Sequence, residues 1–183
     1  IGSRLVGSEM CIRDRLLIDG LFHPDFSRCY LAMQALIKRD AQEIWSAIEN
    51  CWQDKAHNDY GAHYFLMRLF GLVEGWTEEA LLDIRKILSN AITDKRPQFR
   101  KSPPAALLSF AILFPGQYDC FLDNCLSLKN TLSWDIRYAA LLLIQSDQTE
   151  HLQLRYQRQL QQLVELDVDS VLQLKAQSIL DRG

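Results

Sequence analysis

A chain of 183 residues, of which 48% are hydrophobic and 23% charged, has the length and composition of one globular domain. Its formal net charge of −3 at pH 7 gives no general attraction for phosphate backbones, so we expect no nucleic-acid partner. No run reaches the roughly 18 apolar residues of a membrane span, and no apolar secretory signal opens the chain. Five cysteines without a CxxC pair are typical of a reduced protein. These features predict a cytoplasmic protein that does not bind membranes.

The first fifteen residues differ in character from the rest of the chain. Residues 5–15 read LVGSEMCIRDR, which resembles a peptide produced when sequencing-adapter DNA is translated in frame. Ile1–Arg15 also lacks a clean helical period and a capping residue. We therefore expect residues 1–15 to be a non-native, disordered leader, and residues 16–183 to be a single domain that has lost its true N-terminus. The alternative is an ordinary ragged N-terminus.

Nine segments carry the apolar periodicity of helices, whereas sustained alternation typical of strands is absent. The first begins after His23-Pro24-Asp25, because proline and aspartate suit a helix N-terminus. We predict an all-α protein with helices over residues 26–38, 41–53, 60–73, 77–91, 105–114, 117–128, 134–144, 149–166 and 169–181.

A recurring module links these helices. In three of them a small residue is followed four positions later by a large aliphatic residue on the same helical face: Ala32 and Leu36, Ala140 and Ile144, and Ala176 and Leu180. Weaker copies are centred on Leu66 and Ser109, so the central positions are 34, 43, 31 and 36 residues apart. Spacing in this range is the signature of stacked helix pairs. We expect an α-solenoid of about four antiparallel helix pairs.

The module resembles the HEAT-repeat family, whose second helix carries an acidic residue, an aliphatic–arginine pair, a small residue and a leucine. Trp134–Ala140, with the sequence WDIRYAA, is the best match. Asp167 with Leu172, Ala176 and Leu180 is a partial match, because Gln173 stands where the arginine would be. The resemblance covers most of residues 22–182 and implies a binding role without catalysis.

Residues with the potential for chemistry are scattered. The four histidines form no metal-ligand set, and we expect surface or capping roles for His57 and His63. Cys120 and Cys125 lie about 140° apart around a helix, which favours buried packing over a disulfide or a shared metal. No nucleophile-elbow, phosphate-loop, dinucleotide or zinc-protease motif occurs. The sequence therefore predicts no catalytic residue, no metal and no cofactor.

Partner-binding residues are predicted in two places. The longest connector, residues 93–102, carries Lys95, Arg96, Arg100 and Lys101 together with Phe99, a set that suits an acidic partner. The alternative for this loop is a solvated linker. Aromatic and arginine side chains dominate binding energy at many interfaces, so we add as anchor candidates Trp45, Trp52, Trp134 and Arg137.

Three functions fit these observations. The first is a non-catalytic scaffold that binds another protein, with a concave face formed by one set of helices. The second is a bacterial immunity-type protein that neutralises a toxin. The third is an enzyme or enzyme accessory of HEAT-like fold, either DNA-repair-glycosylase-like or pigment-lyase-like. We favour the scaffold, and the oligomeric state stays open.

Overall fold

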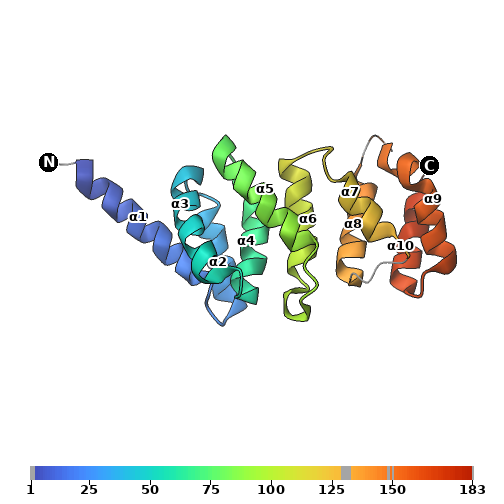
Figure 1. The fold of residues 1–183 in the computed structure, drawn as a ribbon, viewed down its shortest axis with the longest axis horizontal. Coiled ribbons are helices and arrows are strands. Elements are labelled where there is room, and N and C mark those ends of the chain that lie inside the picture. The colour runs from blue at the N-terminus through green and yellow to red at the C-terminus, as the bar shows by residue number, and fades with distance from the viewer. Residues whose placement is uncertain (1–2, 129–132, 148, 150, 183) are drawn as a thin grey trace. The chain divides into compact units, whose positions relative to one another are not determined.

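The structure, a computed structural model, describes residues 3–128, 133–147, 149 and 151–182, and these residues are helical apart from turns and loops (Figure 1). The α-helices among them are α1 (Ser3–Gly20), α2 (Phe26–Leu36), α3 (Ala41–Cys51), α4 (Tyr60–Leu72), α5 (Glu78–Ile92), α6 (Ser102–Leu113), α7 (Asp119–Leu126), α8 (Trp134–Ser146), α9 (His151–Leu166) and α10 (Ser170–Leu180). A π-helical turn, Trp52–Ala56, follows α3, and a 3₁₀ turn, Pro97–Phe99, precedes α6.

The all-α fold class is confirmed, and each predicted helix has a counterpart among α2 to α10. Residue 150 of the predicted helix 149–166 lies outside the described residues. The sequence reasoning missed α1, which includes residues of the expected leader. Backbone contacts divide the chain into two compact units, residues 1–91 and 92–183. The single domain and the foreign leader stay predictions, and each unit is described by itself.

Aspartate side chains fix where many of these helices begin. Each accepts hydrogen bonds from backbone N–H groups of the first turn, which have no partner within the helix. In unit 1 Asp25, Asp40 and Asp59 cap α2, α3 and α4, and the Asp59 carboxylate lies 2.8 Å from the Ala62 nitrogen. In unit 2 Asp169 caps α10 in the same way.

In unit 1, helix α1 packs against α2 and α3, and α2 packs against α4. The crossing of α1 and α2 is close because its residues are small. A Cβ atom added to Gly20 would lie 2.9 Å from the Cβ of Ala32, the first small residue of the repeat. Helix α4 is almost continuously apolar, and most of its side chains are buried.

An ion pair ties α1 to the residues that follow α2. The Arg39 Nε donates to the Asp14 Oδ1 at 2.7 Å, and the Asp14 side chain is only 1% exposed. This hydrogen bond raises the pKa of the Arg39 guanidinium. The carboxylate of Asp14, a residue of the expected leader, thus takes part in the packing of unit 1.

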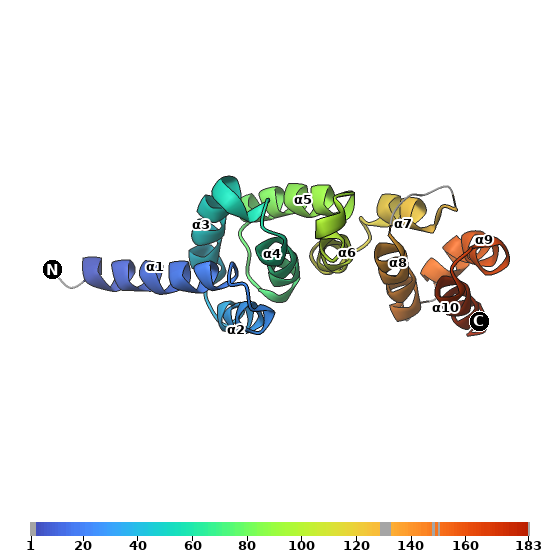
Figure 2. The ribbon, with the colours of Figure 1, turned by 90° about the horizontal axis from the view of Figure 1, so that it is seen from below.

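In unit 2, helix α8 packs against both α6 and α10, and α9 packs along α10 (Figure 2). Helix α7 contacts α8 and α9. Ala140 and Ala176, the small residues predicted on α8 and α10, are completely buried at 0% exposure. Among the described helices of both units, none is long and apolar enough to cross a membrane.

Candidate partner-binding site

The connector between α5 and α6 is a structured turn. Asp94 accepts hydrogen bonds from the backbone and the guanidinium of Arg96, with a shortest distance of 2.7 Å between Arg96 Nη2 and Asp94 Oδ2. The Arg96 guanidinium also lies over the Phe99 ring, 3.8 Å from its centroid, and Phe99 is 2% exposed. Arg96 therefore holds the turn together, and Phe99 is a core residue of the loop.

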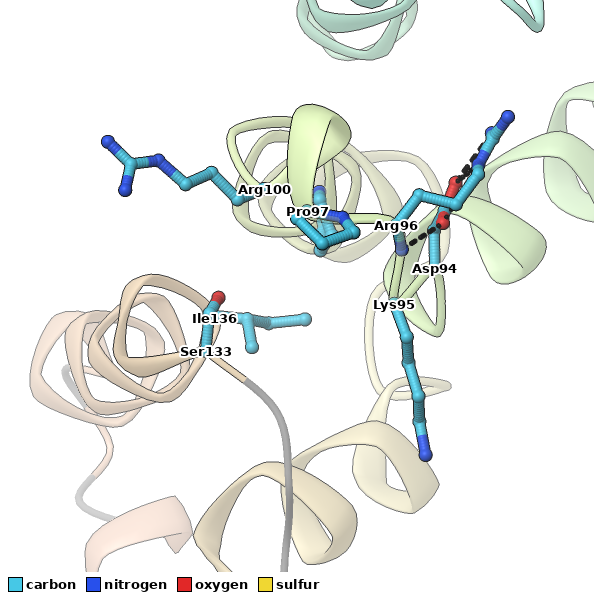
Figure 3. Close-up of a pocket in the computed structure, with 8 residues that line it drawn as sticks. Asp94, Lys95, Arg96, Pro97, Arg100, Ser133 and Ile136 are labelled. Atoms are coloured by element: carbon cyan, nitrogen blue, oxygen red, sulfur yellow. Dashed lines mark hydrogen bonds and ion pairs between the residues drawn. The ribbon is translucent and has the colours of Figure 1, made fainter.

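A pocket of ≈ 170 Å³ opens beside this turn, entirely within unit 2 (Figure 3). Its wall combines the turn with the beginnings of α6 and α8: Asp94, Lys95, Arg96, Pro97, Arg100, Pro103, Ser133 and Ile136. In Figure 3 the Ile136 side chain points toward Pro97, while the side chains of Lys95 and Arg100 point away from each other. The cations thus stand at the edges of a small, partly apolar hollow.

The charge distribution of the pocket favours an anion. Lys95 and Arg100 are exposed. Both α6 and α8 begin at the pocket, and neither has a side-chain hydrogen bond at its N-cap. Helix N-termini carry partial positive charge, and the first turn of α8 also presents unpaired N–H groups, whereas Pro103 and Pro104 in the first turn of α6 have no N–H to donate. The volume is below the ~300 Å³ at which drug-sized ligand pockets begin, so the pocket suits one carboxylate-sized group.

Of the predicted loop residues, Lys95, Arg96 and Arg100 line the pocket, whereas Phe99 is buried and packs against the Arg96 guanidinium. Lys101 is exposed and directly precedes α6. A cation that attracts an acidic partner has to be free of carboxylates of its own chain. Arg96 does not meet this condition, because the Asp94 carboxylate two residues away neutralises it.

The predicted anchors lie apart from the pocket. In unit 1 Trp45 is half-buried against Trp76, and Trp52 is half-buried with its ring 5.3 Å from that of His63. His63 itself is 3% exposed, so the expected surface role is wrong for this histidine. Trp45 and Trp52 as partner-binding residues stay predictions.

In unit 2 Arg137 lies within the protein. Its Nη2 donates to Asp167 and its Nε to the Cys125 carbonyl oxygen at 3.3 Å, and its side chain is 12% exposed. Trp134, at the start of α8, is 50% exposed, with its ring 6.0 Å from that of Tyr138. Both residues stay predicted partner anchors, and Trp134 offers the larger free surface.

Sequence reasoning missed the part of the pocket that comes from α8. Ser133 and Ile136 lie more than thirty positions after the loop, and neither residue type carries a signal of its own. The repeat offered a signal, because consecutive second helices of stacked pairs run side by side and bring their first turns together.

The described residues contain no group of three or more His, Cys, Asp or Glu side chains that suits a metal ion. The cysteines on α7 differ sharply. Cys120 is exposed, whereas Cys125 is buried, and burial raises the pKa of the Cys125 thiol to about 12. The predicted buried packing is therefore confirmed for Cys125 and wrong for Cys120.

Two curated proteins are similar to this chain. Bilin biosynthesis protein CpeY from Synechococcus sp. (strain WH8020) is 38% identical over 175 residues, which cover 94% of this chain and 40% of that protein. The uncharacterized phycocyanin operon protein Y from Pseudanabaena tenuis (strain PCC 7409) is 33% identical over 129 residues, or 70% of this chain and 29% of that protein. The chain therefore spans at most about two-fifths of the length of these relatives. No family model and no solved structure matches the chain.

The similarity corrects the functional prediction. A non-catalytic scaffold is contradicted by extended identity to a protein named for bilin biosynthesis, and the expectation that the chain is not an enzyme falls with it. The pigment-lyase-like alternative agrees best with this finding. The sequence misled because the HEAT resemblance rests on packing residues, and packing residues carry no information about catalysis.

Proposed function

We propose that this chain is part of a bilin-processing enzyme of the pigment-lyase type, acting in the cytoplasm on a bilin and a protein partner. The observation that carries the proposal is the 38% identity to bilin biosynthesis protein CpeY over nearly the whole chain. Identity at this level over 175 residues accompanies a shared fold and, commonly, a shared substrate class. The phycocyanin operon protein supports a protein partner that carries bilins, and phycocyanin is the candidate its name provides.

A HEAT-like repeat is part of the same proposal. Arg137 comes from the best copy of the module, and its partner Asp167 is the acidic residue of the next copy. Gln173, which replaces the arginine in that copy, donates its side-chain N–H to the Asp167 carbonyl oxygen at 2.7 Å. Polar residues of the motif thus link neighbouring copies, which supports stacked repeats in unit 2.

The protein partner binds, in this proposal, at the pocket lined by Asp94, Lys95, Arg96, Pro97, Arg100, Pro103, Ser133 and Ile136. Lys95 and Arg100 attract an acidic surface, and the hollow between α6 and α8 accepts one carboxylate side chain of the partner. Arg96 acts indirectly, because its guanidinium is engaged by Asp94 and stabilises the turn that carries the two exposed cations.

Pigment transfer to a protein tests the proposal. The 183-residue chain is incubated with biliverdin, as a bilin, and with pigment-free phycocyanin subunits, and pigment that stays on the subunits after denaturation is measured. We expect the chain to bind both substrates and to increase the attached pigment above the spontaneous level. A matched control replaces the chain with the Lys95→Glu/Arg100→Glu variant. A chain that binds no biliverdin, or that leaves the attached pigment at the spontaneous level, overturns the proposal.

A further inference from the structure

The face that α8 and α10 share in unit 2 carries exposed aromatic and aliphatic side chains next to one cation. On α8, Trp134, Tyr138 and Leu142 follow each other at intervals of four residues and therefore lie on one side of the helix. Trp134 is 50% and Leu142 37% exposed, and Tyr138 is half-buried between them. Over eight residues this stripe is about 12 Å long.

Helix α10 completes the face. The Lys175 Nζ lies 5.5 Å from the centre of the Tyr138 ring and donates to the side-chain oxygen of Gln145, also on α8. Val171, one turn earlier on the same side of α10, is 51% exposed. We call Trp134, Tyr138, Leu142, Val171 and Lys175 the α8–α10 face.

The rings of Trp134 and Tyr138 are 6.0 Å apart and inclined by 70°, so they contact edge to face. An edge-to-face pair leaves part of the indole surface without a stacking partner. Purely aliphatic partners gain only apolar contact from such a surface, whereas a flat conjugated molecule gains ring stacking as well. Lys175 adds a positive charge over the Tyr138 ring, and this charge complements a carboxylate.

We propose that the α8–α10 face binds the bilin itself, with its conjugated rings on Trp134 and Tyr138 and one of its carboxylates at Lys175. Bilins are open-chain tetrapyrroles whose flat rings carry carboxylate side chains, so both features of the face have a counterpart in this ligand. The inference rests on the proposed function for the identity of the pigment. It assigns pigment and protein to different parts of unit 2, because Trp134 and Ile136 are about 160° apart around α8 and only Ile136 lines the pocket.

Binding of biliverdin to the 183-residue chain tests the assignment, with quenching of tryptophan fluorescence and induced circular dichroism of the pigment as readouts. Trp134→Ala is expected to weaken biliverdin binding about ten-fold, in line with the loss of one stacking side chain. Lys175→Gln is expected to weaken it about three-fold at low salt and less at high salt. The control Leu154→Ala removes an exposed leucine from α9 and should bind biliverdin like the parent.

Each outcome decides between the two proposals. Thermal unfolding of every variant first shows that the fold is kept, which we expect because Trp134 is half-exposed. If Trp134→Ala and Lys175→Gln bind biliverdin as tightly as the parent does, the α8–α10 face is not the pigment site, while the proposed function stands. If these variants no longer bind phycocyanin subunits but bind biliverdin as the parent does, the face is a protein-docking surface and the inference is overturned. A parent chain that binds no biliverdin refutes both proposals.

Discussion

Arg137 on α8 donates a hydrogen bond to Asp167, thirty residues later in the chain, and both side chains are almost completely buried, at 12% and 2% exposure. Asp167 also accepts from the Asp169 backbone N–H at 2.9 Å, just before α10 begins. One carboxylate thus connects α8 to the start of α10. Arg137 therefore links α8 to the segment that precedes α10.

Removing either partner of this ion pair should destabilise unit 2. Arg137→Met leaves the Asp167 carboxylate buried without its cation, and breaking a buried ion pair costs about 3–5 kcal/mol. Urea unfolding measures the loss. Arg155→Met is a matched control, because the Arg155–Asp119 pair is 46% and 30% exposed and should contribute no more than about 1 kcal/mol. Equal losses in the two variants would contradict a structural role for the buried pair.

Gly20 should tolerate no larger side chain. The Cβ of Gly20→Ala would lie 2.9 Å from the Cβ of Ala32, so α1 and α2 must separate. We expect a net loss of about 1–2 kcal/mol, because overpacking outweighs the better helix propensity of alanine. Gly61→Ala serves as control, since its closest contact would be 3.4 Å. An unchanged urea midpoint for Gly20→Ala would show that α1 does not pack on α2 in this way.

A substitution of Asp14 tests whether the first fifteen residues contribute to the stability of unit 1. If the contact of Asp14 with Arg39 stabilises unit 1, Asp14→Ala should lower the free energy of unfolding by about 1.5–3 kcal/mol, the usual contribution of a hydrogen bond to a charged group. Arg13→Ala, an exposed neighbour on α1, should have almost no effect. If Asp14→Ala is as stable as the parent, a leader without structural importance, as the sequence predicted, becomes the better description.

Helices α2 to α10 could be predicted from the sequence because the causes of helix formation are local, whereas α1 was missed and some helix ends differ by two or three residues. Asp25, Asp40 and Asp59 each cap the helix that directly follows them, so the capping residue and the helix are adjacent in the sequence. The small residue Ala140 marked a buried helix contact for a similar reason, since its spacing to Ile144 is one helical turn. These features need no knowledge of distant residues.

The candidate site was only half visible, because its other half depends on tertiary structure. The loop cations stood out by their number, yet the ion pair of Arg96 with Asp94 depends on the conformation of the turn. Ser133 and Ile136 reach the pocket only through the packing of α8 on α6. The pocket residues also could not select one of the three functions that fitted the sequence, because lysine, arginine, proline and serine form no motif that specifies a reaction.

The two cysteines of α7 should react at very different rates. At pH 8 iodoacetamide should label the exposed Cys120 quickly and leave Cys125 unlabelled in the folded protein, because burial raises the Cys125 pKa from 9.0 to about 12 and little reactive thiolate forms. Because the folded pKa is the higher one, burial of the neutral thiol favours folding below pH 9.0, and this contribution is lost as the pH rises toward about 12. Peptide mass spectrometry identifies the labelled residue. Rapid labelling of Cys125 in the folded chain would contradict its burial.

Reversing the charge of two loop residues should separate binding from folding. Lys95 and Arg100 are exposed at the edge of the pocket, so Lys95→Glu/Arg100→Glu should change the free energy of unfolding by no more than about 0.5 kcal/mol per substitution. The same variant should associate with phycocyanin subunits at least about ten-fold more slowly than the parent at low salt, because long-range attraction is replaced by repulsion.

Salt and a second variant complete this experiment. Raising the ionic strength to 0.1 M shortens the Debye length to about 10 Å, so the parent should lose most of its rate advantage there. Arg96→Glu is the contrasting variant: it places a second carboxylate beside Asp94 and should destabilise the turn itself. If Lys95→Glu/Arg100→Glu associates with the subunits as fast as the parent does at low salt, the loop is a linker. The protein partner would then have to bind elsewhere, with Trp45 and Trp52 of unit 1 as the next residues to substitute.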